Sequence, residues 1–231
     1  MLLGDLHIHS MYSDGRPHPK EILLEAVHRG IQVIAVTDHD TFKGSIVARR
    51  IAEAEQLDVV VLVAAEVRTS LGDVLVYCPE EPPARMPRDP GSLAEEAHRA
   101  GCIVAPAHPY DVLRGGLGDA VYELRDCIDA IEVYNAKSLP LFNEKALRAA
   151  EALGLPGIGG SDAHILDNIG SAYTRIDSEP DPWSIIEAIR AGRVKPGIRR
   201  TSIRGRIKST LWSIRRRMGL RARSLDWEEL Y

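Results

Sequence analysis

Cysteine is scarce in this sequence: three residues occur among 231, and no two of them form a Cys-x-x-Cys motif. This scarcity argues against a disulfide framework and a thiolate zinc site, and it fits a reducing compartment. The N-terminus lacks a basic segment followed by an apolar run, so we expect no signal peptide. The longest apolar run, at 59–65, is too short to span a bilayer. We therefore expect a cytoplasmic protein.

Charge is distributed unevenly, although the overall composition, 45% hydrophobic and 27% charged, is ordinary for a globular protein. Residues 1–194 contain 18 Lys and Arg against 30 Asp and Glu, a net charge of −12. Residues 195–223 contain 11 Lys and Arg and no acidic residue, a net charge of +11. An acidic body suits cation binding, and the basic segment is a separate module. We expect one domain at 1–198 and a basic amphipathic extension at 199–231.

Short apolar runs alternate with amphipathic segments, which predicts an α/β fold. Ser92, with Glu95 three residues later, predicts a capping box at the start of one helix. Alternation on this scale favours parallel strands joined by right-handed crossovers, and about seven such units suggest a barrel. Strands are expected at 2–8, 31–36, 59–67, 74–77, 102–107, 130–134, 157–160 and 172–176, and helices at 19–29, 44–56, 92–100, 139–153 and 182–191, with a short helix within 115–125.

Polar residues recur where the expected strands end. His7 and His9 share one face if 2–8 is a strand, because side chains alternate along it. Such a pair alone is a weak signal, but a carboxylate, Asp14, follows it in a Ser-Asp-Gly turn. In a barrel the carboxyl ends of the strands converge on one face, where active sites lie. The residues expected there are His7, His9, His39, Glu66, His108, Asn135, Asp162 and His164.

This set combines imidazole and carboxylate groups without thiolate, which selects zinc, manganese, iron(II) or, as an alternative, magnesium. The ligands are too many for one ion, so we expect two or three ions, with Glu66 as a bridge. Clustered divalent ions would supply a bridging hydroxide near neutral pH and clamp a phosphoryl group. Hydrolysis of a phosphate ester follows from this kind of site. Hydrolysis of an amide or lactone stays open on the same grounds.

Other polar residues have simpler interpretations. The histidines within or beside predicted helices are interpreted as solvated or packing residues, and the aspartates beside His39 as orienting or turn residues. The serines of the first loop are interpreted as turn-stabilising groups. The glycine-rich stretch at 115–118 lacks the lysine and helix of a phosphate-binding loop. These residues are His18, His28, His98, Asp38, Asp40, Ser10 and Ser13.

Several motifs together resemble the PHP (polymerase and histidinol phosphatase) family over about residues 1–198. They are Asp5-Leu-His-Ile-His-Ser, Ser13-Asp-Gly, Thr37-Asp-His-Asp, Ala65-Glu-Val, Ala107-His-Pro, Ile131-Glu-Val-Tyr-Asn and Gly160-Ser-Asp-Ala-His. The branch that they resemble is that of small stand-alone phosphoesterases related to RNase AM and nucleoside 3′,5′-bisphosphate phosphatases. The resemblance implies a distorted, TIM-like (β/α)7 barrel with a trinuclear metal site and no catalytic side chain beyond a metal-bound water.

The resemblance also implies a ligand set. One ion would be held by His7, His9, Glu66 and Asp162, a second by Glu66 and His108, and a third by Asp14, His39 and His164. Related sequences place a histidine seven residues after the bridging glutamate, where this chain has Asp73. We expect Asp73 to bind the second ion and to shift its preference toward harder metals.

The substrate is less well defined. Arg16 and Lys43 follow metal-bearing loops and could bind phosphate, and Asn135 could bind substrate or orient a ligand. The family spans phosphate monoesters, nucleotides and 5′-end digestion of nucleic acid. An alternative from another class is a non-catalytic or regulatory metal-binding module. The basic extension could pack on the acidic barrel, contact nucleic acid or, least favoured, lie on a membrane. Its apolar stripe would be Ile203, Ile207, Leu211, Ile214 and Met218.

Overall fold

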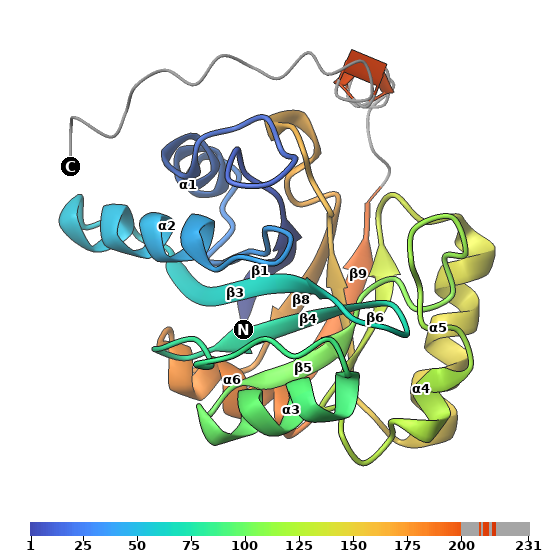
Figure 1. Cartoon of the computed structure of the whole chain (residues 1–231). Helices are drawn as coiled ribbons and strands as arrows, with labels where there is room; N and C mark the ends of the chain where they lie inside the picture. The colour runs from blue at the N-terminus through green and yellow to red at the C-terminus, as the bar shows by residue number, and fades with distance from the viewer. Residues whose placement is uncertain (200–207, 209, 213, 216–231) are drawn as a thin grey trace.

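Two β-sheets form the centre of the computed structural model, which describes residues 1–199, 208, 210–212 and 214–215 (Figure 1). One sheet has seven strands in the order β5-β4-β3-β2-β1-β8-β9, and the other pairs β6 with β7. The strands are β1 (Leu2–Ile8), β2 (Val33–Val36), β3 (Val60–Arg68), β4 (Asp73–Cys78), β5 (Ile103–Pro106), β6 (Ile131–Asn135), β7 (Gly157–Gly160), β8 (Ala172–Ile176) and β9 (Val194–Ile198).

The two sheets lie close together. β7 contacts β1, β8 and β9, while β6 contacts β5 and β9, so the pair fills the space between the two ends of the curled larger sheet. The helices are α1 (Pro19–His28), α2 (Lys43–Ala54), α3 (Pro90–Arg99), α4 (Ala120–Glu123), α5 (Pro140–Leu153) and α6 (Pro182–Arg190), with a 3-10 turn, η1 (Leu166–Asn168).

Strand direction differs from the expectation in two places. β1, β2 and β3 pair in parallel, as do β6 and β7. β4, however, is antiparallel to both β3 and β5, and β8 is antiparallel to both β1 and β9. The prediction of parallel strands throughout is therefore wrong for β4 and β8. The physical reason is that no crossover α-helix precedes either strand: β4 follows β3 by a hairpin loop, and β8 follows β7 with only the 3-10 turn η1 between them.

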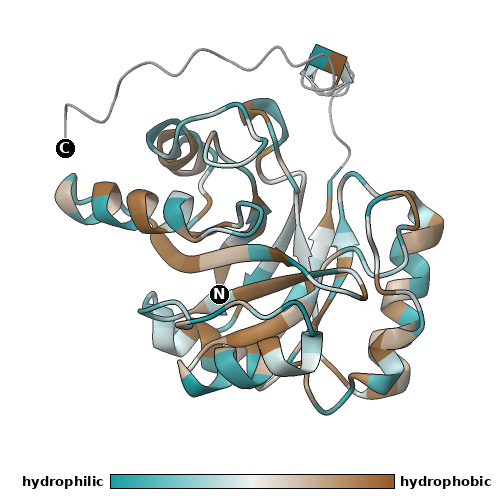
Figure 2. Ribbon diagram, viewed as in Figure 1, coloured by the Kyte–Doolittle hydropathy of each residue, from teal (hydrophilic) through white to brown (hydrophobic). Residues whose placement is uncertain are grey.

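Apolar side chains explain the packing between sheet and helices. Figure 2 shows hydrophobic residues along the strands and hydrophilic residues on the outer sides of the helices. Ile34 and Leu62, on neighbouring strands, are completely buried, as is Leu23 on α1. The near-continuous burial of β2 and β3 is typical of strands covered on both faces. The central strands therefore form a rigid base for the loops at their carboxyl ends.

Helix starts follow the chemistry of the first turn, with one correction. Proline stands in the first turn of α1, α3, α5 and α6, where its missing N–H costs no hydrogen bond. The expected capping box on Ser92 is wrong: Asp89 is the N-cap of α3, and its carboxylate accepts a hydrogen bond from the Ser92 backbone N–H. Pro90 fits immediately after that cap. A capping box does occur in α1, where His18 is the N-cap and Glu21 bonds back to it.

A disulfide joins Cys78 and Cys102, which the cysteine count did not lead us to expect, and Cys127 is free. β4 and β5 are antiparallel, and Tyr77 pairs with Ile103, so the two cysteines come next in the ladder and face each other. Their Cα atoms lie 4.1 Å apart. A separation of 24 residues gives no local sign of this pairing.

Most of the predicted C-terminal extension, including Ile203, Ile207 and Met218, lies outside the described residues. Of the part described, the Lys208 ammonium pairs with the Asp167 carboxylate at 2.7 Å. The Trp212 indole N–H donates to the Asp14 carbonyl oxygen at 3.1 Å. Within the described part of the chain, no helix combines the length and apolar character needed to cross a membrane.

Candidate metal centre

Histidines and carboxylates from several strands meet at the carboxyl edge of β1, β2 and β3. His7 lies in β1 and His9 directly after it, while Glu66 lies near the end of β3. Asp73 begins β4 and pairs with Arg68, so the reversed direction of β4 brings its first residue to the same edge. The remaining residues of this set lie in the loops that follow β1, β2, β5 and β7: Asp14, His39, His108, Asp162 and His164.

Backbone pairing holds these loops in register with the strands. The His9 N–H donates to the Ala163 carbonyl at 2.9 Å, and the Asp162 N–H donates to the His7 carbonyl at 2.7 Å. His39 and Glu66 form an isolated parallel bridge. Gly160 lies so close to His7 that a Cβ atom there would overlap the His7 side chain. The metal-ligand candidates of β1 and β7 are thus fixed relative to each other by main-chain contacts.

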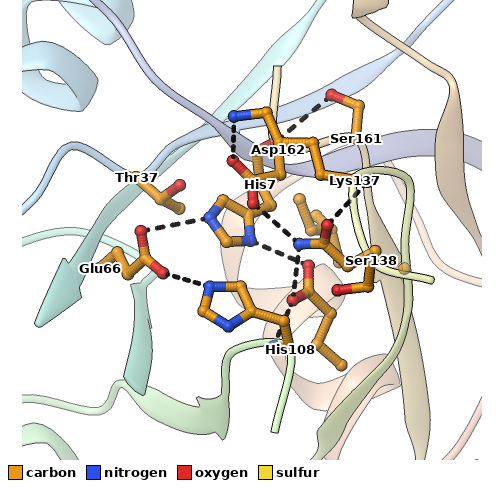
Figure 3. Close-up of polar contacts among 12 residues, drawn as sticks. His7, Thr37, Glu66, His108, Lys137, Ser138, Ser161 and Asp162 are labelled. Carbon is orange, nitrogen blue, oxygen red and sulfur yellow. Dashed lines mark hydrogen bonds and ion pairs between the residues drawn. The ribbon is translucent and has the colours of Figure 1, made fainter. Parts of the chain in front are cut away.

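Glu66 contacts four imidazoles, and Figure 3 shows its contacts with His7 and His108. Its Oε2 atom lies 3.4 Å from His7 Nε2, 3.2 Å from His9 Nε2 and 3.2 Å from His39 Nδ1. Its Oε1 atom lies 3.0 Å from His108 Nε2. The carboxylate is 1% exposed, so these imidazoles rather than water surround it. The two oxygens of Glu66 therefore face different groups of histidines, as a bridging carboxylate requires.

The donor atoms form three overlapping groups, and within each group all atoms lie within 4.8 Å of one another. Glu66 belongs to two of the groups and His9 to two, so the groups are contiguous. The groups are His7, His9 and Glu66; His9, Asp14 and His164; and Glu66, Asp73 and His108.

The two predicted ligands outside these groups lie beside them. His39 Nε2 is 3.8 Å from Asp14 Oδ2, and Asp162 Oδ1 is 3.5 Å from His9 Nε2. His164 Nε2 is 3.0 Å from Asp14 Oδ1. All nine residues expected from the sequence thus meet in one place, although the structure groups His9 rather than His39 with Asp14 and His164.

The donor set suits divalent cations. The Nε2 atoms of His7 and His9 lie 3.1 Å apart and converge on the Glu66 carboxylate. Both imidazoles are at most 1% exposed, so water cannot satisfy their ring nitrogens. Buried nitrogens and carboxylate oxygens with no thiolate among them match zinc, manganese or iron(II). The residues therefore fit the metal ions that their chemistry implies.

Glu132 is a functional candidate that residue-by-residue reasoning missed. One of its oxygens contacts His7 Nδ1 at 2.9 Å, and the other accepts a hydrogen bond from the His108 backbone N–H at 2.7 Å. Asn135 also donates to it, at 3.1 Å. A carboxylate on the outer nitrogen of a ligating histidine fixes the ring and its tautomer. Glu132 belongs to the Ile131-Glu-Val-Tyr-Asn motif, of which the sequence prediction used only the last residue, Asn135.

Two buried aspartates hold the main chain around the cluster. Asp5 accepts hydrogen bonds from the backbone N–H groups of Ser161 and Gly170 at 2.9 and 2.7 Å. Asp38 accepts from the hydroxyl groups of Ser10 and Ser13, both at 2.5 Å. The interpretation of these serines as turn-stabilising groups is therefore confirmed. Asp38 orients the first loop and lies outside all three donor groups.

Burial and neighbouring charges give the cluster unequal proton affinities. Burial disfavours the charged form of His7, but Glu132 and Glu66 outweigh it and raise the pKa of His7 to about 9. Burial lowers the pKa of His39 to about 4. For His164, burial together with Lys137 lowers the pKa well below its ordinary value. In the metal-free protein at neutral pH, His7 is therefore charged and lies against the carboxylates. His39 and His164 are neutral, the form that binds a cation.

Asp73 is the residue that departs from the usual pattern of related sequences. Burial and the nearby Glu66 raise its pKa to about 7. A carboxyl beside another carboxylate is favoured as the charged form only when a cation lies between them. Donor atoms of Asp73, Glu66 and His108 lie within 4.8 Å of one another, close enough for one cation to contact all three.

Two cations at the centre were not predicted from the sequence. Arg114 donates to Asn135 Oδ1 at 3.1 Å and also pairs with Asp162. Lys137 Nζ lies 3.2 Å from Asp162 Oδ1 and 2.6 Å from His164 Nδ1. Burial, with Arg114 adding to it, lowers the pKa of Lys137 well below its ordinary value. Lys137 follows Asn135 by two residues, and that proximity was the only sequence signal.

Arg16 and Lys43, the cations expected from the sequence, lie farther out. Both side chains are exposed, and neither forms an ion pair with any residue that the structure describes. The Arg16 backbone N–H donates to the His164 carbonyl at 2.9 Å, which places the residue beside the centre. Lys43 begins α2, after the loop that carries His39.

Two residues of the cluster adopt left-handed backbone conformations. His108 has φ +31° and Asp162 has φ +52°, and neither is glycine. Such conformations cost free energy and persist where the surrounding structure over-determines them. Their position at the centre indicates that side-chain placement outweighs local strain there.

Comparison with known proteins identifies the family. The family model described as PHP domain matches residues 5–134, and a second model, described as PHP-associated, matches residues 140–194. The uncharacterized protein MJ1587 of Methanocaldococcus jannaschii is 30% identical over 145 residues, which cover 58% of this chain and 81% of that protein.

Solved structures share the fold. A two-domain protein from Bacteroides vulgatus that contains a predicted PHP-like metal-dependent phosphoesterase aligns with a TM-score of 0.73 at 22% identity, covering 86% of this chain and 65% of that one. A lesion-specific endonuclease from Pyrococcus furiosus aligns with a TM-score of 0.56 at 18% identity, covering 84% and 57%. This chain thus spans less than two thirds of either neighbour. By the match of residues 5–134 and the motif-bearing loops within them, the chain belongs to the PHP domain family.

Proposed function

We propose that this protein is a metal-dependent phosphoesterase, a hydrolase that cleaves a phosphate ester at a centre of two or three divalent ions. The observation that carries the proposal is the overlap of three donor groups through Glu66 and His9, directly beside Arg114 and Lys137. A centre for structure alone would need neither shared ligands nor partly buried cations beside them. The phosphoesterase named in the Bacteroides vulgatus structure and the endonuclease from Pyrococcus furiosus support the same class of reaction.

The proposed ligands follow the donor groups. His7, His9, Glu66 and Asp162 would hold the first ion, which requires Asp162 to turn from its cation partners. Glu66 would bridge to a second ion held by Asp73 and His108. Asp14, His39 and His164, with His9 close by, would hold the third. When bound, such ions supply Lewis acidity and lower the pKa of coordinated water toward neutrality.

Glu132 and Asn135 would keep the donor atoms aimed. Glu132 contacts His7 Nδ1 and so directs the opposite nitrogen, Nε2, at Glu66. Asn135 donates to both Glu132 and Asp162, at 3.1 and 3.0 Å, and so fixes two carboxylates with one amide. We propose that Asn135 acts mainly through these carboxylates.

Arg114 and Lys137 would bind the phosphate group. Both now pair with Asp162, and a metal ion on Asp162 would free them for an anion. A guanidinium presents paired N–H donors to phosphate oxygens, and an ammonium adds a point charge. An arriving phosphate would also favour the charged form of Lys137, whose pKa burial has lowered. Arg16, beside His164 and exposed, would contact the part of a substrate that extends outward, and Lys43 at the start of α2 is a second candidate for that role.

The fold is consistent with this assignment. We interpret the curled seven-stranded sheet and the β6–β7 pair as two parts of a distorted (β/α)7 barrel, with the centre at the carboxyl ends of its parallel strands. The substrate would be a phosphomonoester, a nucleotide or the end of a nucleic acid.

The test combines metal counting with hydrolysis. The full chain is stripped with a chelator, reloaded separately with manganese, zinc, iron(II) and magnesium, and its bound metal is counted. Hydrolysis of a generic phosphomonoester, a phosphodiester and a 5′-phosphorylated oligonucleotide is then measured. We expect two or three ions per chain and hydrolysis of at least one substrate. Bound metal without hydrolysis of any of the three would overturn the proposal and favour a non-catalytic metal module.

A further inference from the structure

The outer face of the antiparallel strand pair β8 and β9, whose strands are joined through α6, carries positive charge that the metal centre does not use. Tyr173 pairs with Gly197 and Arg175 pairs with Lys195 in the antiparallel register. Directly paired residues lie on the same face, and so do residues two apart along a strand. Arg199, two residues after Gly197, therefore continues this row. We call Tyr173, Arg175, Lys195 and Arg199 the cationic face.

Two of the cations gather around the aromatic ring. The Arg199 guanidinium carbon lies 5.0 Å from the centroid of the Tyr173 ring, and that of Arg175 lies 5.9 Å from it. Gly197 permits this arrangement, because a Cβ atom there would overlap the Tyr173 ring. The Tyr173 ring thus lies over Gly197, with the guanidinium groups of Arg175 and Arg199 close to it.

Within the described part of the chain, the positive charges of this face lack acidic partners. Arg175 and Lys195 are like charges directly opposite each other, an arrangement that destabilises a strand pair unless an anion offsets it. Among the residues that the structure describes, no carboxylate forms an ion pair with Arg175, Lys195 or Arg199, including Asp177 just beyond β8. A shallow cavity of about 190 Å³ opens here, lined by Tyr173, Arg175, Lys195 and Pro196. The face therefore offers both charge and space to an anion.

The arrangement is linear. Lys195 and Arg199 are four residues apart on β9, which corresponds to about 13 Å along an extended strand. β8 runs antiparallel to β1, with Leu2 opposite Ile176, so the Arg199 end of the face lies toward the metal-bearing edge of the sheet. A single phosphate ion would need cations that converge on one point. Cations spaced along a line suit a chain of phosphates.

We propose that the cationic face binds the backbone of a single-stranded nucleic acid. Positive side chains that follow the backbone, with an aromatic ring among them, are the pattern by which proteins bind single strands without sequence preference. A membrane surface is less suited, because Ile198 is the only large apolar residue exposed on β8 or β9. The basic sequence after Arg199 continues the same charge, since no acidic residue occurs before Asp226. This inference does not depend on the proposed phosphoesterase activity.

Binding is tested with the full chain in excess chelator, so that hydrolysis cannot interfere. Fluorescence anisotropy measures the affinity for a labelled oligothymidylate of about twenty nucleotides as a function of salt concentration. We expect the triple variant Arg175→Gln/Lys195→Gln/Arg199→Gln to bind at least tenfold more weakly. Its log–log salt slope should fall by about 2, because each lost phosphate contact removes about 0.7 for a single strand.

A matched variant controls for net charge. Three other arginines pair with glutamates of α3 and α5, away from β8 and β9. They are Arg85, Arg99 and Arg148. Changing these three to glutamine should leave the affinity within twofold of the native value. An affinity of the β8–β9 variant within twofold of native, or an equal loss in the control, would overturn the proposal. Thermal melting of both variants shows that the difference lies in binding and not in folding.

Further comparisons decide the ligand. Tyr173→Phe should retain binding, whereas Tyr173→Leu should weaken it several-fold. Displacement of the oligonucleotide by millimolar inorganic phosphate would identify a simple anion site. Tighter binding to phosphatidylserine vesicles than to the oligonucleotide would identify a membrane surface, and either result would overturn the assignment. Metal-dependent hydrolysis of a small phosphomonoester should be unchanged in the triple variant, which separates this inference from the proposed function.

Discussion

The metal centre and the cationic face use charge in opposite ways. The centre gathers mostly buried side chains that are as far apart in sequence as His7 and His164, and its imidazole nitrogens lie within 4 Å of carboxylate oxygens. The cationic face uses exposed cations on and beside two neighbouring strands, and none of the described carboxylates pairs with them. The difference teaches that a centre of fixed geometry depends on the whole fold, while a surface for a flexible polyanion needs only two neighbouring strands.

The sharpest test of the centre is removal of its shared carboxylate. Glu66→Gln keeps the size of the side chain but removes the charge that two donor groups share. We expect loss of at least one bound ion and a fall in kcat on the order of 1,000-fold. Metal analysis and hydrolysis of a phosphomonoester measure both effects. Glu53→Gln, an exposed change on α2, is the control, and retention of full activity by Glu66→Gln would refute the central role.

The cations beside Asp162 should have the next largest effect. We expect Arg114→Gln and Lys137→Gln each to reduce kcat/KM by about 100-fold while the metal content stays near native. Steady-state kinetics and metal analysis separate these outcomes. Lys145→Gln, an exposed change on α5, is the matched control. If Lys137→Gln lost metal but kept its kcat per bound ion, Lys137 would be a structural residue.

Glu132 tests how far the centre extends beyond its donor atoms. Glu132→Gln should weaken metal binding by about 10- to 100-fold, because the carboxylate that fixes His7 is lost. Titration with manganese, followed by binding isotherms, gives the affinity. Glu144→Gln on α5 provides a control with the same change in charge, and an unchanged affinity in Glu132→Gln would make its contact with His7 incidental.

The raised pKa of Asp73 makes the folding stability of the metal-free protein depend on pH. Its folded-state pKa of about 7 lies above the ordinary value of 3.8, so the metal-free folded protein binds more protons between these values than the unfolded chain. The contribution of Asp73 to stability is therefore complete at low pH and lost as pH rises through 7. We expect metal-free Asp73→Asn to be more stable than the native chain at pH 8, by about 1 kcal/mol after allowance for solvent screening, and equal to it near pH 4. Chemical denaturation at both pH values measures this difference.

Bound metal should reverse the sign of the difference in folding stability between Asp73→Asn and the native chain. With manganese bound, Asp73→Asn should be the less stable protein at pH 8, because the native carboxylate gains a cation. The same denaturation experiment in excess manganese provides the comparison. A metal-loaded variant more stable than the native chain would show that Asp73 is not a ligand.

The smallest effect on hydrolysis is expected at the cationic face. The Arg175→Gln/Lys195→Gln/Arg199→Gln variant should hydrolyse a small phosphomonoester within twofold of the native rate. If this variant lost the small-substrate activity as strongly as Arg114→Gln, the separation between centre and surface would be wrong.

Sequence reasoning succeeded where one physical rule placed a residue. Parallel strands present their carboxyl ends at one edge, so His39 and His108 could be expected near His7 from the apolar runs before them. Asp73 also lies at this edge, for a reason that the sequence did not show. Because β4 runs antiparallel to β3, its first residue lies beside the carboxyl end of β3.

Sequence reasoning failed where tertiary contacts decide. Arg114 lies in a loop whose path over the centre no periodicity records, and Lys137 meets it only because both pair with Asp162. Cys78 meets Cys102 only because β4 and β5 pair in one particular register. Asp89 rather than Ser92 caps α3, since a proline after a good capping residue makes the earlier start better. Most of these misses therefore concern how segments meet. One segment was missed outright, because β9 (Val194–Ile198) is not among the expected strands.

The contact between Gly160 and His7 has a wider consequence. It is where the small sheet touches the large one, and it leaves no room for even a methyl group. A screen for inactive variants would therefore report position 160 as essential, although it carries no atom that could bind metal or substrate. What such a screen would detect is the spacing between two halves of the molecule, on which the alignment of every donor atom depends.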